Sequence, residues 1–118
     1  MFDAETLKFV FVNRGARNNI GYTMEELEEM TPMQITPEYD ERSFRRHVEQ
    51  LVSGKSEKTV FETCHRRADG SRYDVEVHLQ RVEGIENMLL VAVVLDITER
   101  KEAEHKLKQS EKKYRLLF

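Results

Sequence analysis

An apolar stretch that runs without a loop into a charged tail constrains this chain more than any other feature. The stretch covers residues 88–95 and leads directly through Asp96-Ile97-Thr98 into a charged segment that reaches Phe118. Eight apolar residues without alternation predict a strand in the middle of a sheet, covered on both faces. Because no turn residue follows the strand, a displacement of the strand must reach the tail with little slack. This layout is typical of a module that transmits a mechanical signal rather than one that turns over a substrate.

The composition limits the size and the class of the protein. The chain has 118 residues, enough for one domain, and the net charge of −3 argues against a dedicated nucleic-acid binder. The longest apolar run is far shorter than the ~20 residues that a membrane helix needs, so we expect no membrane contact by this segment. The single cysteine, Cys64, cannot form an internal disulfide, which fits a reducing compartment. We therefore expect a cytoplasmic location, although the parent protein can still be membrane-associated.

The first third of the chain predicts two short strands followed by short helices. Residues 8–12 are β-branched and aromatic, so we expect a strand that pairs with residues 1–4. Asn13 can cap the next short helix, which Gly21 ends. The sequence Thr23-Met24-Glu25-Glu26 is a capping box that opens another short helix, and Thr31-Pro32 is expected to stop it.

The middle of the chain predicts a longer helix and then a hairpin. Apolar residues recur at helical spacing over residues 40–52, and Gly54 is expected to end this helix. Strands are expected over residues 59–66 and 71–82, joined at Asp69-Gly70, because glycine accepts the positive φ that the turn requires. The second strand alternates apolar and polar residues, so one of its faces is covered and the other is wet or faces a pocket.

The tail predicts a helix with a weak coiled-coil seam. Ala103, Leu107, Ser110, Tyr114 and Leu117 recur at alternating spacings of four and three. With so few strong apolar positions, this seam needs a partner helix or a neighbouring domain. We expect a homodimer formed through this linker helix.

Three motifs in this order resemble those of a PAS domain with its C-terminal PAC portion. They are Phe11-Val12-Asn13 with Gly21-Tyr22-Thr23, then Phe61-Glu62 through Asp69-Gly70-Ser71, and finally Asp96-Ile97-Thr98-Glu99-Arg100. The resemblance implies an α+β fold: a five-stranded antiparallel sheet, short helices across one face, and a small cavity between them. Residues 1–98 would be the PAS/PAC sensory domain.

The same resemblance makes residues 99–118 a signalling or coiled-coil linker helix that leads to a further domain outside this sequence. Residues 110–118 also resemble the opening of a following PAS repeat. The first strand has almost no lead-in, so the N-terminus looks trimmed, and where the native N-terminus begins stays open.

The resemblance also implies a function. Such domains usually stand upstream of bacterial histidine kinases, diguanylate cyclases or transcription regulators, and would relay a signal through Asp96, Ile97 and Thr98. Thr98 is expected to cap the tail helix by accepting backbone amides. Candidate residues for a small-molecule pocket lie on the sheet and on the longer helix, with plain hydrophobic core as the alternative: Phe9, Phe11, Phe44, Val48, Tyr73, Val75, Leu90 and Ala92.

The cofactor remains unknown, and neither haem nor flavin is expected. His47 lies on the helix where some PAS domains place a haem ligand, but a lone histidine is weak support. The flavin-binding Asn-Cys-Arg motif is absent, and Cys64 falls in a strand. The basic residues Arg42, Arg45, Arg46 and Lys55 can pair with nearby glutamates or face an anionic ligand. Asn19 can face solvent or the pocket.

Three functions are therefore open. The first is a non-enzymatic sensory and dimerisation module that controls a downstream kinase or cyclase. The second is a structural dimerising spacer between tandem repeats with no small ligand. The third is an enzyme on a curved sheet, for which Asp74 and His78 are the only strand candidates, and both fall on the more polar face. We expect no catalytic residue and no metal site.

Overall fold

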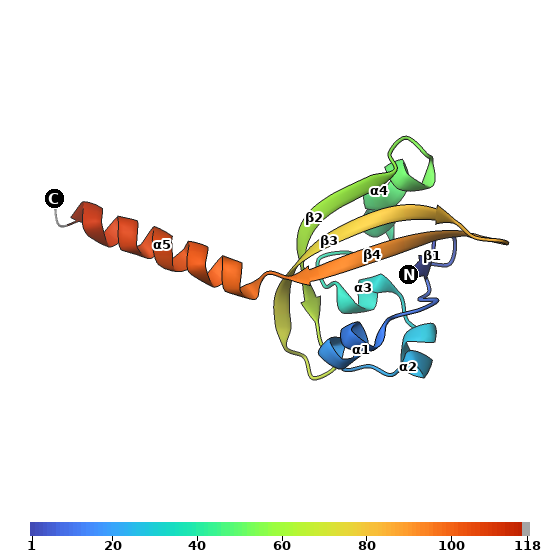
Figure 1. Cartoon of the computed structure of the whole chain (residues 1–118), viewed down its shortest axis with the longest axis horizontal. Helices are drawn as coiled ribbons and strands as arrows, with labels where there is room; N and C mark the ends of the chain where they lie inside the picture. The colour runs from blue at the N-terminus through green and yellow to red at the C-terminus, as the bar shows by residue number, and fades with distance from the viewer. Residues whose placement is uncertain (117–118) are drawn as a thin grey trace.

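Short helices cover one face of a four-stranded antiparallel sheet, and a long helix leaves the sheet at one end (Figure 1). The computed structural model describes residues 1–116, and side chains as far as residue 109. The strands are β1 (Phe2–Asp3), β2 (Lys58–Arg66), β3 (Arg72–Glu83) and β4 (Met88–Asp96), in the spatial order β1-β4-β3-β2. The helices are α1 (Arg14–Ile20), α2 (Met24–Glu28), α3 (Pro32–Ile35), α4 (Glu41–Val52) and α5 (Thr98–Leu116). The α+β class predicted from the sequence is confirmed.

The inner face of the hairpin of β2 and β3 packs against α4 in the core. Its register runs from Lys58↔Gln80 to Arg66↔Arg72, which agrees with the predicted turn at Asp69-Gly70. Alternation along β3 directs four side chains to the inner face, where they pack against buried residues of α4. The packed residues are Tyr73, Val75, Val77 and Leu79 from the strand and Phe44, Val48 and Leu51 from the helix.

The predicted strand over residues 8–12 is wrong, and the sheet has four strands rather than five. This segment makes only an isolated bridge, Phe2↔Phe9. Leu7 adopts a left-handed conformation with φ of 65°, and the N–H of Phe9 points away from β1 and donates to the Met30 carbonyl. Val10 and Phe11 stay about half exposed, at 47% and 53%. The β-branched composition of the segment was a weak guide because so little packs against it.

β4 lies inside the sheet, but the prediction that both of its faces are covered is wrong. β3 pairs with it from Met88 to Asp96, whereas β1 pairs only with Leu89 and Leu90. Past that point Val93 and Leu95 are about half exposed, at 56% and 47%. Both side chains alternate out of phase with the buried Leu90, so they lie on the outer face of the sheet, which the short helices do not cover.

The helix ends follow the predicted signals. The side chain of Asn13 accepts from the Ala16 N–H at 2.8 Å, and Gly21 ends α1 in the left-handed region with φ of 86°. Thr23 and Glu26 form the expected capping box of α2. α2 ends at Glu28, ahead of Thr31-Pro32, where it was expected to stop. Pro32 itself begins the one-turn helix α3, because the first helical position needs no N–H donor.

A single residue, Ile97, joins β4 to α5. Its side chain is buried, and its N–H donates to the Asp74 carbonyl at 3.0 Å, so the joint is fixed to β3. The Asp96 carboxylate accepts from both the N–H and the hydroxyl of Thr98, at 2.9 and 2.6 Å. The prediction that Thr98 accepts backbone amides is therefore wrong: Thr98 donates, and Asp96 is the capping group.

Ion pairs hold the first turn of α5 against the outer face of the sheet. Glu62 on β2 pairs with Arg100 and, at 2.8 Å, with Lys101. Arg100 also lies 3.6 Å from Glu76 on β3. Side chains 102–109 are all exposed, so the helix leaves the domain as a rod (Figure 1).

The predicted seam of α5 is only partly within the described region. Ala103 and Leu107 are exposed, the side chains of Ser110 and Tyr114 lie outside the described ones, and Leu117 lies outside the described residues. Among the described helices, none is both long enough and apolar enough to cross a membrane.

Candidate functional site

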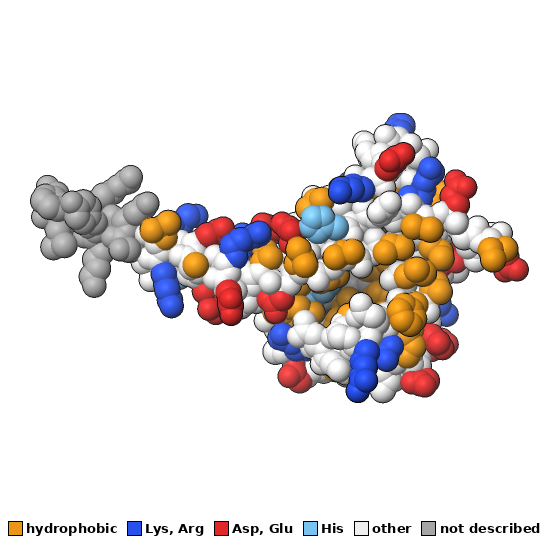
Figure 2. All heavy atoms as spheres, in the orientation of Figure 1, with side chains coloured by type: hydrophobic (Ala, Val, Ile, Leu, Met, Phe, Trp, Pro, Cys, Tyr) orange, Lys and Arg blue, Asp and Glu red, His pale blue; other side chains and the backbone are white. Residues whose placement is uncertain are grey.

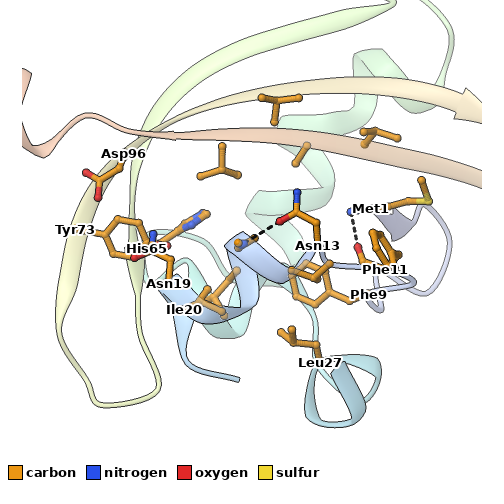
Figure 3. Close-up of a pocket in the computed structure, with 18 residues that line it drawn as sticks. Met1, Phe9, Phe11, Asn13, Asn19, Ile20, Leu27, His65, Tyr73 and Asp96 are labelled. Atoms are coloured by element: carbon orange, nitrogen blue, oxygen red, sulfur yellow. Dashed lines mark hydrogen bonds between the residues drawn. The ribbon is translucent and has the colours of Figure 1, made fainter. Parts of the chain in front are cut away.

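A cavity of about 550 Å³ lies between β4 and α1 (Figure 3). Its volume falls within the ~300–1,000 Å³ range that is typical of small-molecule sites. One wall is β4, from Val91 to Val94 with Asp96, and the opposite wall is α1 with the segment that leads into it. The other lining residues are Met1, Phe9, Phe11, Val12, Asn13, Gly15, Ala16, Asn19, Ile20, Leu27, Ile35, His65 and Tyr73.

The sequence of α1 leaves this space open. The cap at Asn13 starts the helix beside the cavity, and the next inward positions are Gly15 and Ala16, which add little bulk. At the other end, Gly21 approaches Ala68 so closely that an added Cβ would lie 3.3 Å from the Ala68 Cβ. The Ala68 N–H donates to the carbonyl of Ile20 at 2.9 Å, which ties α1 to the β2–β3 turn.

Polar groups collect at the end of the cavity near this turn. The guanidinium of Arg67 lies 4.1 Å from the ring centroid of Tyr73 and donates to the Asn19 carbonyl at 3.1 Å. The ring of His65 meets the Tyr73 ring edge-on, with centroids 5.9 Å apart. Asn19 lines the cavity and is also exposed to solvent, so it combines the two placements left open by the sequence. The site combines long apolar walls with one polar end.

The charges at this end are set by burial and by hydrogen bonds. Burial lowers the pKa of His65 to about 4, so its imidazole is neutral at pH 7. Burial raises the pKa of the Tyr73 phenol, with a smaller opposing effect from Arg67. The hydrogen bonds from Thr98 lower the pKa of Asp96, whose carboxylate stays charged. Arg67 stands behind Tyr73 and does not itself line the cavity, so a ligand at this end would meet neutral donors and acceptors and one carboxylate.

A second cavity, between the sheet and α3 and α4, holds only about 70 Å³. Both cavities are lined by Phe9, Ile35, His65, Ala92 and Val94, so they are neighbours. The inner cavity has room for a few water molecules but not for a cofactor.

The predicted pocket residues divide into cavity lining and packed core. Phe9 and Ala92 line both cavities; Phe11 and Tyr73 line the larger one, and Phe44 lines the smaller one. The remaining three, Val48, Val75 and Leu90, are buried in the core and line neither cavity. The predicted relay residue Asp96 also lines the larger cavity.

Sequence reasoning missed His65, Asn13 and the α1 residues of the cavity other than Asn19. His65 could have been found, because it alternates in phase with Phe61 and Thr63 on β2 and is paired with Tyr73 across the hairpin. The α1 residues carried no such signal, because the position of α1 against β4 depends on tertiary contacts.

The two side chains weighed for haem and flavin in the sequence, His47 and Cys64, line neither cavity. The His47 ring packs against Phe61, with centroids 4.2 Å apart, and lines neither cavity. Cys64 alternates out of phase with the buried neighbours Thr63 and His65, so it lies on the outer face of β2. Within residues 1–109, no group of three His, Cys, Asp or Glu side chains is arranged to hold a metal ion.

The other candidate groups lie away from the cavities. Asp74 and His78 are on the outer face of β3, where the Nε2 of His78 is 2.9 Å from a Glu76 carboxylate oxygen. Arg45 pairs with Glu41 at 3.1 Å and donates to the Glu5 carbonyl. For this residue the structure agrees with the alternative that the basic side chains pair with nearby glutamates.

Comparison with known proteins agrees with this architecture. A family model described as a PAS domain matches residues 1–99. A search of curated proteins gives no match. The PAS domain of an HTR-like protein from Haloarcula marismortui is 28% identical, with a TM-score of 0.71, over 81% of this chain and 82% of that one.

Two further solved structures share the fold at lower identity. A PAS domain from Desulfitobacterium hafniense is 20% identical, with a TM-score of 0.68, over 80% of this chain and 87% of that one. A PAS domain from a two-component sensor histidine kinase is 22% identical, with a TM-score of 0.65, over 80% of this chain and 79% of that one.

Proposed function

This chain belongs to the PAS domain family, and we propose that it is a non-enzymatic sensory module that couples an occupant of the β4–α1 cavity, or a neighbouring domain, to the orientation of α5. The observation that carries this proposal is the one-residue joint at Ile97. β4 forms one wall of the cavity and continues through this joint into α5. An occupant that moves β4 therefore moves the base of the helix.

The energetic requirement is a protein with two arrangements of similar free energy. An occupant can shift their populations only by the difference between its affinities for the two arrangements. Asp96 is well placed for this role, because it lines the cavity and also caps Thr98 at the start of α5. We propose that α5 then passes the change to a downstream histidine kinase or diguanylate cyclase, as part of a homodimer formed through this helix.

Pulsed electron spin resonance can test the coupling. Nitroxide labels at Lys58→Cys and Lys106→Cys, in a Cys64→Ala background, report the distance from β2 to α5. We expect one narrow distance distribution, and a broad one after two glycines are inserted behind Asp96. Two glycines inserted into the turn at Gly84 are the control and should leave the distribution narrow. An equally narrow distribution after the Asp96 insertion would contradict the rigid joint.

The ion pairs at the base of α5 give a second expected result. Glu62→Gln removes the partner of both Arg100 and Lys101. Because these groups are exposed and screened by solvent, we expect little change in unfolding free energy. The label distribution should nevertheless broaden, since the first turn of α5 is no longer held against the sheet. Glu102→Gln, at an exposed site on α5, is the matched control; equal distributions for both variants would show that the ion pairs do not orient the helix.

A dimerising spacer is the second candidate function, and the small size of the inner cavity favours it. In that case removal of residues 99–118 should abolish self-association in sedimentation experiments. A thermal-shift screen of small metabolites, haem and flavins should then find no stabilising compound. A compound that stabilises the domain and shifts the label distances would favour the sensory module instead.

A further inference from the structure

The first turn of α5 carries two cations, Arg100 and Lys101, that lie between carboxylates of two different elements. Lys101 Nζ is 2.8 Å from a Glu62 oxygen on β2 and 3.9 Å from a Glu104 oxygen on α5 itself. Arg100 also pairs with Glu62, and its Nε lies 4.0 Å from Glu104. Because Glu104 belongs to the same helix, it stays within reach of both cations wherever the helix points. Each cation therefore has one partner on the sheet and one that travels with it.

Two carboxylates of the sheet face each other at this place. Glu62 and Glu76 are directly opposite in the β2–β3 ladder, and both lie on the outer face. Like charges in this arrangement destabilise a pair of strands. Arg100 bridges them, since it pairs with Glu62 and lies 3.6 Å from one Glu76 oxygen, while His78 Nε2 is 2.9 Å from the other. The repulsion between the two carboxylates returns when the helix leaves, so the sheet favours a docked α5.

The pKa values of the paired groups follow the same contacts. The hydrogen bond from Lys101 is the largest cause that lowers the pKa of Glu62, and the nearby charge of Glu76 acts to raise it. Glu62 in turn raises the pKa of Lys101 more than Glu104 does. The carboxylate on the sheet is thus the stronger of the two partners while the helix is docked.

The ion pairs are the main restraint on the tilt of α5. Ile97 is buried and fixes where the helix begins, but all side chains of residues 102–109 are exposed. Figure 2 shows acidic and basic side chains gathered where α5 leaves the domain. Among the described side chains, none beyond Lys101 is buried against the sheet. The joint therefore sets the origin of the helix, and the ion pairs set its direction.

Salt acts unequally on a docked and a tilted helix. The docked helix has contacts with the sheet and with Glu104, whereas a tilted helix keeps only Glu104 and leaves Glu62 and Glu76 to repel each other. The side chains that make the sheet contacts are between 23% and 46% exposed, so dissolved ions reach them. The screening length falls from ~30 Å at 0.01 M to ~3 Å at 1 M ionic strength. Rising ionic strength therefore removes more attraction from the docked arrangement than from the tilted one.

We propose that Arg100 and Lys101 form a charge latch that rising ionic strength opens, so that both cations leave Glu62 and Glu76 for Glu104 and α5 tilts away from the sheet. The latch responds to ionic strength and not to a particular ion, because its contacts are screened charge pairs rather than an enclosed binding site. It supplies the two arrangements of similar free energy that a sensory module needs. Its role in signalling therefore rests on the proposed function, whereas its response to salt does not.

Pulsed electron spin resonance at two salt concentrations tests the latch. The labels are those at Lys58→Cys and Lys106→Cys, in chains diluted with unlabelled protein so that each distance lies within one chain. We expect a second distance to grow between about 0.02 M and about 0.5 M sodium chloride, with the ratio of docked to tilted chains falling roughly tenfold.

Two variants on α5 distinguish an exchange of partners from a general effect of salt. Glu104→Gln removes the partner of the tilted arrangement without touching the sheet. The tilted fraction at about 0.5 M salt should therefore fall several-fold below that of the parent chain. Glu102→Gln is the matched control, because the Glu102 side chain is exposed and pairs with no cation among the described side chains. Its label distances should follow those of the parent chain.

Three results would overturn the inference. The first is the same distance distribution at both salt concentrations. The second is an equal tilted fraction for Glu104→Gln and the parent chain. The third is a response that differs between sodium chloride and potassium nitrate at equal ionic strength, which would make a bound ion the cause.

The same labels separate this inference from the proposed function. A compound that stabilises the domain and shifts the label distances, in a chain that does not respond to salt, would support the sensory module and contradict the latch. A salt response that depends on Glu104, in a chain whose distances no stabilising compound shifts, would support the latch and contradict coupling to the cavity.

Discussion

Replacing Leu90 by alanine is expected to cost about 2–5 kcal/mol of unfolding free energy, the range for large-to-small changes in a packed core. Leu90 is fully buried, in a cluster with Phe2 on β1 and Leu79 on β3. The truncation leaves a void between the sheet and its helices, because these neighbours can close in only partly. Urea denaturation followed by circular dichroism measures the loss as a lower midpoint.

Two further variants control for the leucine substitution. Leu107→Ala, on the exposed part of α5, should change the unfolding free energy by less than about 0.5 kcal/mol. Leu90→Met keeps most of the volume and should cost less than about 1.5 kcal/mol. A midpoint for Leu90→Ala that equals the midpoint for Leu107→Ala would mean that β4 is not packed as described.

The stability of the domain should fall as the pH is lowered from 7 to 5, and His65 should be a main cause. Burial lowers its pKa to about 4, whereas an unfolded histidine titrates near 6.5. Between pH 6.5 and about pH 4 the imidazole is therefore protonated in the unfolded chain but neutral in the folded chain. The free energy of unfolding falls as the pH is lowered through this range, and it levels off below about pH 4. The resulting loss of unfolding free energy is about 2 kcal/mol at pH 5 and about 3 kcal/mol below pH 4.

Urea titrations at pH 7 and pH 5 on the parent chain and on His65→Leu measure this contribution. The unfolding free energy of His65→Leu should fall by about 2 kcal/mol less than that of the parent chain over that interval. The pKa of His47 is also lowered by burial. The same titrations on His47→Leu therefore measure how much His47 contributes to the remaining loss of unfolding free energy. The carboxyl groups whose pKa is lowered, such as Asp96, lose their contributions at lower pH. Equal losses for the parent and His65→Leu would show that the imidazole is not buried and neutral.

Local signals in the sequence predicted most of the fold. The hairpin at Asp69-Gly70, the caps at Asn13 and Thr23 and the end of α1 at Gly21 each depend on contacts within a few residues. The strand over residues 8–12 could not be judged in the same way, because whether it pairs depends on how much of β1 lies beside it. The exposure of β4 was equally inaccessible, because an apolar run does not reveal whether a second layer covers the outer face of the sheet.

The candidate site was less accessible to sequence reasoning than the fold. Aromatic and apolar residues such as Phe9 and Val75 look alike in sequence, although one lines a cavity and the other is core. Asp96 was recognised as part of the joint, but its position in the cavity wall follows from where α1 packs. The exchange of roles between Asp96 and Thr98 also depends on side-chain direction, which the motif alone does not state.

The one-residue joint has a geometric consequence for any segment fused to α5. A helix advances ~1.5 Å and turns ~100° with each residue, so an insertion of one residue behind the joint swings everything distal to it about a third of a revolution. Seven inserted residues complete nearly two revolutions and restore the original azimuth, displaced by about 10 Å. Because Ile97 leaves no flexible residue to absorb such a twist, chimeras of this domain should work or fail with the periodicity of a helix.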